Sequence, residues 1–433
     1  MNVKISTSLI SLFLISPLVY LLYSVIGLNF DNFTYLWNNL LLGYSLNTLY
    51  LVFLTVFFSL ILGIVPAWLI STRKFTGKKF FDIVLFLPLA IPSYIMAFTY
   101  SDLLSYTGPF QSYIRNFYPN IYEYVNVDYL QIEILAFLMA LVLYPYLYTA
   151  CRISFSLLGS NYINIAKNLG MSQFQTFFKI IIPISRVSIF SGLFLIVMEV
   201  LNEYGAVKYF GVNTFTSGIF RSWYSMEDVN TASILAVCLL LIVSIFFILE
   251  RYSTSKYRYN YKSNDSVSGN YSTSRLSYIY IYITCLFPFI FGFFVPVIYI
   301  INNVIKTINI IDFDELLLLS FNSFFLAFIS SIIIVSIAIF FQFIKKISKS
   351  KTVFFFSEIV SLTYALPGAV IALSLIIFLA FISKIIGVSI VFGSVTILIY
   401  AYVMRYMAVG ISPLRSSFDK HPNSFDDTGR NLG

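Results

Sequence analysis

Two carboxylates within an apolar stretch are the residues of this sequence best suited to act on a charged substrate. Glu199 and Glu203 are four positions apart, which places them one turn apart on one face of a helix. Carboxylates inside a membrane are costly, usually face a polar cavity or a partner, and are hard oxygen ligands that would suit a passing trivalent cation. We expect both to line a path for a cation. The alternative for Glu203 is a solvated position at the outer surface beside Lys208.

Other kinds of site chemistry find no support in the sequence. His421 is the single histidine, so we expect neither a histidine-based metal site nor a catalytic triad in this chain. Cys151, Cys238 and Cys285 form no zinc-ligand spacing and no disulfide framework. A phosphate-binding glycine loop with a following lysine is also absent from the sequence, so any ATP hydrolysis must reside on another chain. We therefore expect no catalytic residue, no metal site and no cofactor bound by this chain.

The composition requires a membrane around the elements that carry these residues. Of the 433 residues 59% are hydrophobic and only 11% are charged, and the mean hydropathy is +0.86. A soluble domain needs roughly 25% charged residues to cover its surface. Most of this protein's surface must therefore face lipid, which excludes an ordinary soluble protein of two or three domains.

Ten apolar stretches are each long enough for a helix to cross a bilayer, which takes roughly 20 residues. Irregular backbone cannot face lipid, so the sequence predicts an all-α polytopic membrane protein. Pro88, Pro92 and Pro367 fall inside these stretches and could be hinges or static kinks. The predicted spans are 7–28, 47–70, 81–105, 130–151, 186–205, 231–250, 277–301, 319–343, 353–382 and 388–411.

Basic residues are distributed unequally between the two sides of these spans. If the spans alternate in direction, 22 of the 27 lysines and arginines share one side. Positive charge marks the cytoplasmic side, so we expect the N-terminus in the cytoplasm and the first span to be a retained anchor. The net charge of +8 is thereby explained without a nucleic-acid partner.

The sequence resembles itself on either side of a polar linker at 251–276. Ser45–Thr48 matches Ser320–Ser323, and Pro92 matches Pro367, both at an offset of 275. An acidic residue lies near the start of the next span in each copy, Asp82 in the first and Glu358 in the second.

Further along, Ala166–Gly170 is echoed by Gly429–Gly433 at an offset of 263. We therefore predict a first repeat of six spans over 1–250 and a second repeat over 277–433 that holds four. Two equal halves would need two more helices, so the sequence suggests a fragment of a twelve-helix protein. A genuine ten-span protein is the alternative.

The loop at 159–183, between the fourth and fifth spans, contains a short amphipathic helix. Tyr162, Ile165, Ala166 and Leu169 form one apolar stripe, and Gly170 is suited to a left-handed cap. A second amphipathic piece follows, and then a proline allows the chain to re-enter the membrane. Such a helix either binds a protein partner or lies on the lipid surface. The second piece carries Phe174, Phe177, Phe178 and Ile181 on one side, and the proline is Pro183.

The residues from Ile165 to Pro183 resemble the EAA…G…I.LP signature of binding-protein-dependent ABC transporter permeases. In that family the loop forms coupling helices that dock on a cytoplasmic ATPase, so the resemblance implies two ATPase copies, at 159–183 and 413–433. The sequence departs from the signature, since Asn164 replaces the usual glutamate and Ile165 the first alanine. In the second copy the corresponding residues are Asp427, Thr428 and Gly429, followed by the glycine at Gly433.

Other segments are similar to fused two-repeat ferric iron permeases, namely 88–94, 108–111, 202–207 and 209–219. The resemblance implies a multi-pass protein of the bacterial inner membrane with twelve spans in two repeats. It also implies a periplasmic binding protein that delivers substrate to outer loops near 106–130 and 205–230. Fused thiamine permeases share the architecture, and related permeases carry sulfate, molybdate, phosphonates or polyamines, so iron rests on these segments alone.

Two rivals come from other functional classes. An ion-driven secondary transporter also uses repeats and intramembrane carboxylates, but it has no need of an amphipathic cytoplasmic helix capped by glycine. A receptor or scaffold without transport is the other, and uptake measurements would separate it.

Overall fold

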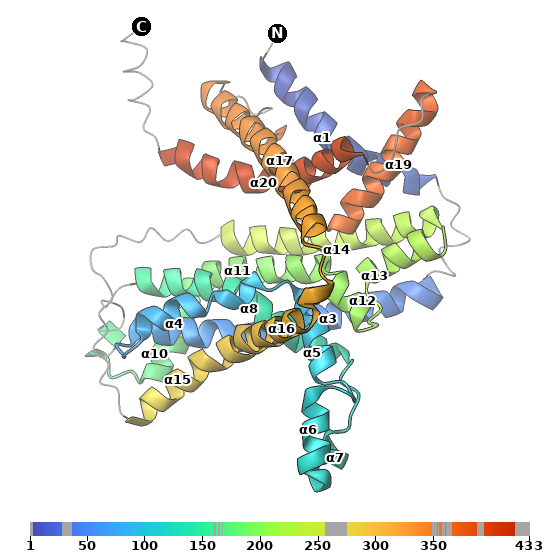
Figure 1. The fold of residues 1–433 in the computed structure, drawn as a ribbon. Helices are drawn as coiled ribbons and strands as arrows, with labels where there is room; N and C mark the ends of the chain where they lie inside the picture. Colours follow the sequence, from blue (N-terminus) through green and yellow to red (C-terminus); the bar gives the residue numbers. More distant parts are fainter. Residues whose placement is uncertain are drawn as a thin grey trace. The chain divides into compact units, whose positions relative to one another are not determined.

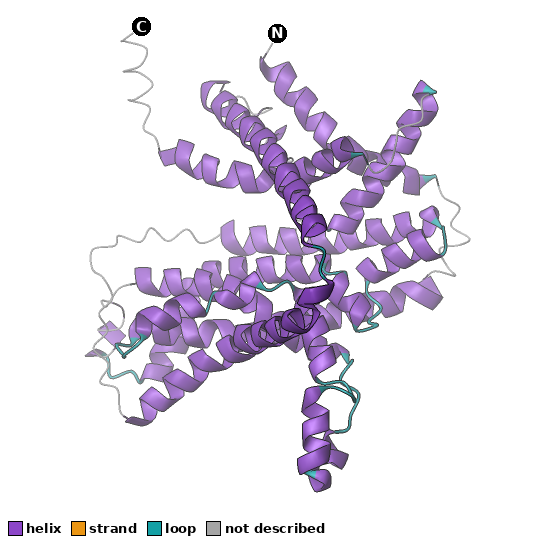
Figure 2. Ribbon diagram, viewed as in Figure 1, coloured by secondary structure: helices purple, strands orange, loops and turns teal. Residues whose placement is uncertain are grey.

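The protein folds almost entirely into helices (Figure 1). The computed structural model describes residues 3–27, 37–158, 162, 165–166, 168–255, 275–348, 353, 355–356, 360, 366–387 and 394–420. Within these residues every regular element is a helix and no strand occurs (Figure 2). The predicted all-α fold class is confirmed.

Nine helices of the described residues are long and apolar enough to cross a membrane, and a bent pair of helices would make a tenth span. They follow the ten predicted spans in order, which confirms a polytopic membrane protein. The nine are Ile5–Ile26, Trp37–Thr72, Ile132–Leu157, Gln173–Asn202, Val229–Glu250, Tyr278–Ile310, Phe313–Lys346, Gly368–Ile386 and Val395–Arg415, and the bent pair is Lys78–Ala90 with Ser93–Leu103.

The helices form two compact units. The larger comprises Thr34–Gly218 and Leu241–Asn309. Its elements are η1 (Trp37–Leu41), α3 (Leu42–Thr72), α4 (Lys78–Val84), η2 (Leu87–Ala90), α5 (Ser93–Leu103), α6 (Pro109–Phe117), α7 (Pro119–Val125), α8 (Ile132–Leu157), α10 (Gln173–Thr176), η3 (Phe177–Ile181), α11 (Ile182–Asn202), α12 (Gly205–Tyr209), α15 (Arg275–Phe289), η5 (Ile290–Phe294), α16 (Val295–Thr307) and η6 (Ile308–Ile310).

The smaller unit comprises Met1–Phe33, Ile219–Leu240 and Ile310–Gly433. Three helices, α13 (Phe215–Phe220), α14 (Val229–Ser255) and the short η6, contribute residues to both units. The other elements of the smaller unit are α1 (Val3–Ile26), η4 (Arg221–Ser225), α17 (Phe313–Ser348), α19 (Gly368–Ile386) and α20 (Val395–Lys420).

Glycines allow the helices at the centre of the larger unit to approach closely. A Cβ built on Gly63 of α3 would lie 3.2 Å from the Leu147 Cβ of α8. A Cβ on Gly192 of α11 would lie 2.9 Å from the Leu147 Cα. Small residues at such crossings are typical of membrane bundles, where van der Waals contact between helices replaces the hydrophobic effect. The bundle of α3, α8 and α11 is the frame on which the loop at 159–183 is mounted.

The predicted span at 81–105 is not one straight helix, because the helices on either side of Pro92, Lys78–Ala90 and Ser93–Leu103, meet at 89°. Pro92 disfavours helical backbone in the residue before it, and Ile91 is extended at φ −97° and ψ 117°. Pro92 then precedes the first residue of α5, where its missing N–H costs nothing. Pro88 lies inside η2 and is buried. The predicted hinge residue Pro92 therefore lies at a real break, and its movement stays a prediction.

Elements of the two sequence copies correspond closely. α8 begins at Ile132 and ends at Leu157, and α20 begins at Val395 and ends at Lys420, an offset of 263 at both ends. α19 starts 275 residues after α5 and also follows a proline, Pro367, whose φ of −60° and ψ of 140° nearly equal the −60° and 144° of Pro92. Within the predicted span at 353–382, α19 covers the part from residue 368 onward.

The crossing of α3 with α8 also has a counterpart. At the repeat offsets Gly63 and Leu147 correspond to Ala338 of α17 and Gly410 of α20. A Cβ on Gly410 would lie 3.5 Å from the Ala338 Cβ and 2.6 Å from Ile334 Cγ2. In the first copy the glycine lies on α3, and in the second copy it lies on α20, which corresponds to α8. Both crossings bring the two helices close together.

The two compact units do not coincide with the two sequence copies, because each unit contains the first helix of the other copy. In the smaller unit α1 packs along α19, with the Tyr20 and Phe381 rings stacked at 4.5 Å. In the larger unit α15 packs on α3 and α16 packs on α5. The division into repeats at 1–250 and 277–433 remains a prediction about the sequence.

Candidate functional site

The loop after α8 contains the short helix that the sequence predicted. Among its described residues Tyr162, Ile165 and Leu169 are exposed by 42%, 54% and 71%. Ala166, which the sequence placed on the same stripe, is fully buried. The stripe is therefore divided: Ala166 is buried against the protein, and the three larger side chains form an exposed outer face. Asn164 lies outside the described residues.

Gly170 ends this helix as predicted. Its φ is +73°, in the left-handed region that only glycine adopts without strain. The next amide, of Met171, donates to the Ala166 carbonyl at 3.0 Å, the bond between the sixth and first residues that marks a glycine-capped helix end. A Cβ on Gly170 would have no atom within 4 Å, so the need for glycine is a matter of backbone conformation alone.

A capping box directly after Gly170 starts the next helix. The Ser172 hydroxyl accepts from the Gln175 amide at 3.2 Å, and the Gln175 side chain accepts from the Ser172 amide at 3.0 Å. The sequence analysis missed these two residues, although their spacing of three is a recognisable signal. The helix then runs without interruption from Gln173 to Asn202, so Pro183 lies within it rather than at its start.

The wide turn η3 lies just before Pro183 and lets the helix continue through this proline. It also explains why Phe174, Phe177, Phe178 and Ile181 do not share one apolar side as predicted. η3 is a π-helix, which holds one residue more per turn than an α-helix and so shifts the faces that follow. Ile181 is buried and the Phe177 ring packs at 5.2 Å from that of Trp68. The Phe174 and Phe178 rings contact each other in a tilted arrangement, with their centroids 4.5 Å apart, and stay exposed by 73% and 52%.

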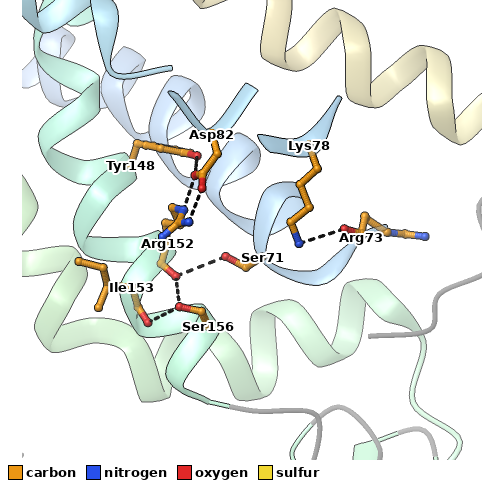
Figure 3. Close-up of polar contacts among 8 residues, drawn as sticks. All are labelled: Ser71, Arg73, Lys78, Asp82, Tyr148, Arg152, Ile153 and Ser156. Carbon is orange, nitrogen blue, oxygen red and sulfur yellow. Dashed lines mark hydrogen bonds and ion pairs between the residues drawn. The ribbon is translucent and has the colours of Figure 1, made fainter. Parts of the chain in front are cut away.

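A polar cluster joins α4 to the end of α8 just before the loop (Figure 3). The Arg152 guanidinium donates two hydrogen bonds to the two carboxylate oxygens of Asp82. The Tyr148 hydroxyl donates to Asp82 Oδ1 at 2.9 Å, and the Ser71 hydroxyl of α3 donates to the Arg152 carbonyl at 3.4 Å. Three helices are thereby tied together at the end of the bundle that bears the loop.

The geometry of this cluster is suited to holding α8 and α4 in a fixed relation. A guanidinium and a carboxylate joined by two parallel bonds resist rotation as well as separation. The Arg152 and Asp82 side chains are exposed by 35% and 24%, so the pair is partly shielded from water. The sequence analysis named Asp82 as a repeat marker, but it did not pair this residue with Arg152.

The two predicted path carboxylates do not share a helical face. Glu199 lies half-buried in α11. Glu203 lies one residue beyond the helix end, with φ −71° and ψ 125°. Its Oε1 accepts from the Ala206 amide at 2.9 Å, and its carbonyl accepts from the Thr216 hydroxyl at 2.7 Å. Glu203 thus organises the turn that follows α11.

This turn packs against the break at Pro92. A Cβ on Gly205 would lie 2.7 Å from the Tyr94 Cβ at the start of α5, so the close contact requires glycine. The end of α11 and the bent span therefore meet. No group of three or more His, Cys, Asp or Glu side chains that could hold a metal ion occurs in the described parts of the chain. The second loop residues Asp427, Gly429 and Gly433 lie outside the described residues, as does His421.

Residues 59–259, which include this loop and the polar cluster, match the family of binding-protein-dependent transport system inner membrane components. This part of the chain is similar to the permease domains of that family. The predicted resemblance is confirmed, and the multi-pass inner-membrane location agrees with the family and with the apolar helices. Permeases of this kind form the membrane component of binding-protein-dependent transport.

Three relatives show how far the likeness extends. The chain is 26% identical over 393 residues to the Fe(3+)-transport system permease protein FbpB 2 of Haemophilus influenzae, covering 89% of this chain and 72% of the relative. It is 26% identical over 166 residues to the sulfate transport system permease protein CysT of Salmonella typhimurium, covering 38% and 57%. It is 28% identical over 178 residues to the molybdenum transport system permease protein ModB of Escherichia coli, covering 41% and 72%.

Proposed function

We propose that the permease is the transmembrane subunit of an ATP-driven importer, and that a cytoplasmic ABC ATPase binds the loop at 159–183. The observation that carries this is the glycine-capped loop helix, whose outer face of Tyr162, Ile165 and Leu169 lies open while Ala166 holds it to the bundle. An exposed apolar helix face of this kind is suited to bind in a hydrophobic groove of a partner protein. This chain supplies the docking helix, and the partner supplies ATP hydrolysis.

The polar cluster gives the docking helix a route into the membrane. Arg152 lies five residues before the end of α8, and it is bonded to Asp82 on α4. α4 leads through η2 to the break at Pro92, where the Glu203 turn packs. A displacement of the loop would therefore reach the bent span through charged hydrogen bonds rather than through soft apolar contacts. Pro88, Pro92 and Pro367 are the proposed hinges.

Ferric iron is the proposed substrate. Support comes from FbpB 2, whose likeness extends over 89% of this chain, whereas the sulfate and molybdenum permeases match 38% and 41% of it. Glu199, half-buried within α11, is the proposed oxygen donor on the path. Uptake of radioactive ferric iron, unaffected by excess sulfate or molybdate, would support iron over the other substrates.

The remaining partners and the orientation belong to the same proposal. A periplasmic binding protein would deliver substrate to the outer loops near 106–130 and 205–230. A second ATPase copy would bind at 413–433. The N-terminus lies in the cytoplasm, and the sequence repeats at 1–250 and 277–433 form the two halves of the permease.

A pull-down with the partner ATPase of the same transport system tests the proposal. Ala166→Glu places a charge at a fully buried position, and Gly170→Pro cannot adopt a φ of +73°. Both variants should lose ATPase binding. Gly43→Ala is the matched control, because Gly43 lies within α3 and its new methyl group would have no atom within 4 Å. This variant should keep ATPase binding. Binding retained by both loop variants would contradict the coupling role.

A further inference from the structure

The hairpin of α6 and α7 is amphipathic, but its aromatic side faces outward and its polar side faces the protein. On α6 Phe110, Tyr113 and Phe117, at positions i, i+3 and i+7, share one face and are exposed by 43%, 55% and 67%. Gln111, by contrast, is only 3% exposed, and its Nε2 donates to the Leu104 carbonyl at 2.8 Å. The polar side of the helix faces the protein and the aromatic side faces outward.

The aromatic surface continues onto α7. Tyr118, Ile121 and Tyr124 are exposed by 51%, 53% and 83%. The Tyr113 ring lies 4.8 Å from that of Phe117 and 6.2 Å from that of Tyr118, so the two helices present one surface. We name this set the aromatic face: Phe110, Tyr113, Phe117, Tyr118, Ile121 and Tyr124.

Charge is nearly absent from this face. The only charged residues of α6 and α7 are Arg115 and Glu123, whose charges cancel. The Arg115 guanidinium lies over the Tyr106 ring at 4.5 Å and the Tyr122 ring at 5.7 Å, which occupies it within the hairpin. A binding protein that docks on the outer loop at 106–130 would find few charged groups on this face to fix its orientation, so we expect it to contact the loop beside the aromatic face and not on it.

The course of the chain carries the hairpin sideways from the bundle. α5 leaves the break at Pro92 at 89° to the helix before it, and α5, α6 and α7 run away from the bundle across the direction of its helices (Figure 1). The far end of α5 is fixed, because the Tyr299 hydroxyl of α16 donates to Asp102 and the Tyr100 hydroxyl donates to the Phe291 carbonyl at 2.6 Å. A segment at right angles to membrane-crossing helices lies along the membrane plane.

We propose that the α6–α7 hairpin lies in the lipid interface of the leaflet opposite the 159–183 loop, with its aromatic face among headgroups and upper acyl chains. α8 follows the hairpin after the short segment 126–131 and ends at the loop, and its 26 residues span about 39 Å, enough to cross the bilayer. Tyrosine rings suit this depth because they join an apolar body to a polar tip. Tyr94 and Phe98 of α5, exposed by 53% and 45%, are further aromatic side chains that lipid can reach on the segment before the hairpin.

Spin labels on the permease in lipid nanodiscs of phosphatidylethanolamine and phosphatidylglycerol test the proposal. In a background with Cys151, Cys238 and Cys285 replaced by alanine, labels at Tyr113, Phe117 and Ile121 should be reached by oxygen more readily than by a water-soluble nickel chelate. Labels at the exposed neighbours Asn116, Asn120 and Glu123 are the matched controls and should show the reverse order.

Three outcomes would overturn it. Nickel access at the aromatic face would place the hairpin in water. Exclusion of both reagents would show that protein covers it. Immobilisation of the three labels only when a periplasmic binding protein is added would make the face a protein-docking site. Because the measurement needs neither ATPase nor substrate, its failure is distinguishable from failure of the importer proposal.

Discussion

At the scale of single residues, Gly170 shows how one backbone angle supports the whole helix of the 159–183 loop. Replacing Gly170 by alanine adds no clash, but holding an L-residue at φ +73° costs about 1–2 kcal/mol. We expect the helix end to open more often, so that exchange of the Met171 amide accelerates and ATPase affinity falls, each roughly 5- to 30-fold. Hydrogen exchange and equilibrium binding measure the two effects.

Gly211→Ala is the matched control for this variant. Gly211 has φ +68° and also no atom within 4 Å of a new Cβ, so the intrinsic strain is the same at a site outside the loop. It should leave the Met171 amide and ATPase binding unchanged. Equal effects of the two variants on ATPase binding would show that general destabilisation, and not the loop helix, is responsible.

At the scale of elements, the joint between α4 and α8 depends on one ion pair. Asp82→Asn leaves the Arg152 guanidinium without its counter-charge in a partly shielded site. We expect a loss of about 1–3 kcal/mol in the free energy of unfolding, between the values for exposed and buried pairs. Unfolding in detergent micelles measures the loss. Exchanging the two residues, by Asp82→Arg with Arg152→Asp, should restore part of it.

Tyr148→Phe separates the ion pair from the rest of the cluster. It removes only the hydroxyl that donates to Asp82 and keeps the ring packed against Phe86 at 5.5 Å. Its effect should be smaller than that of Asp82→Asn. If the exchanged pair were no more stable than Asp82→Asn alone, the joint would owe nothing to the attraction between the charges.

The elements themselves divide into those that hydropathy reveals and those that need the tertiary structure. The span positions and the Gly170 cap can be predicted from local signals. An apolar run of about 20 residues indicates a membrane-crossing helix, and a glycine after a periodic apolar stripe indicates a helix end. For Pro92, the sequence alone could not decide between a hinge and a static kink, and it did not predict the size of the bend. The turn at Glu203 was hidden as well, because a carboxylate four residues after Glu199 looks helical until its cap bond to Ala206 is seen.

Pairs of residues that contact each other across the bundle could not be predicted from the sequence, for a different reason. Asp82 and Arg152 are 70 residues apart, and helical phase gives the face of a residue but not the residue opposite. Likewise, Ala166 fits the apolar stripe by spacing, yet only packing decides that it is the one buried member. The inverted hairpin was missed because amphipathic patterning is normally assigned with the apolar face toward the protein.

At the scale of the whole molecule, the exchange of first helices between the two copies makes the chain's halves interdependent. The smaller unit combines α1 with α17, α19 and α20, and the larger unit combines α15 and α16 with helices of the first copy. Two polypeptides, 1–255 and 275–433, should therefore assemble when expressed together and co-purify through a tag on either one, because each supplies a helix that completes the other's unit.

Aromatic contacts of α1 provide the control for this assembly. The Phe13 ring stacks on that of Tyr400 at 4.8 Å and the Tyr20 ring stacks on that of Phe381 at 4.5 Å, and each such pair contributes about 0.5–1.5 kcal/mol beyond its buried area. Phe13→Ala with Tyr20→Ala should reduce the recovered partner. Tyr23→Ala, at a position exposed by 69%, should reduce it less. Separation of the unmutated halves during purification would mean that the helices are exchanged only when the linker holds them together.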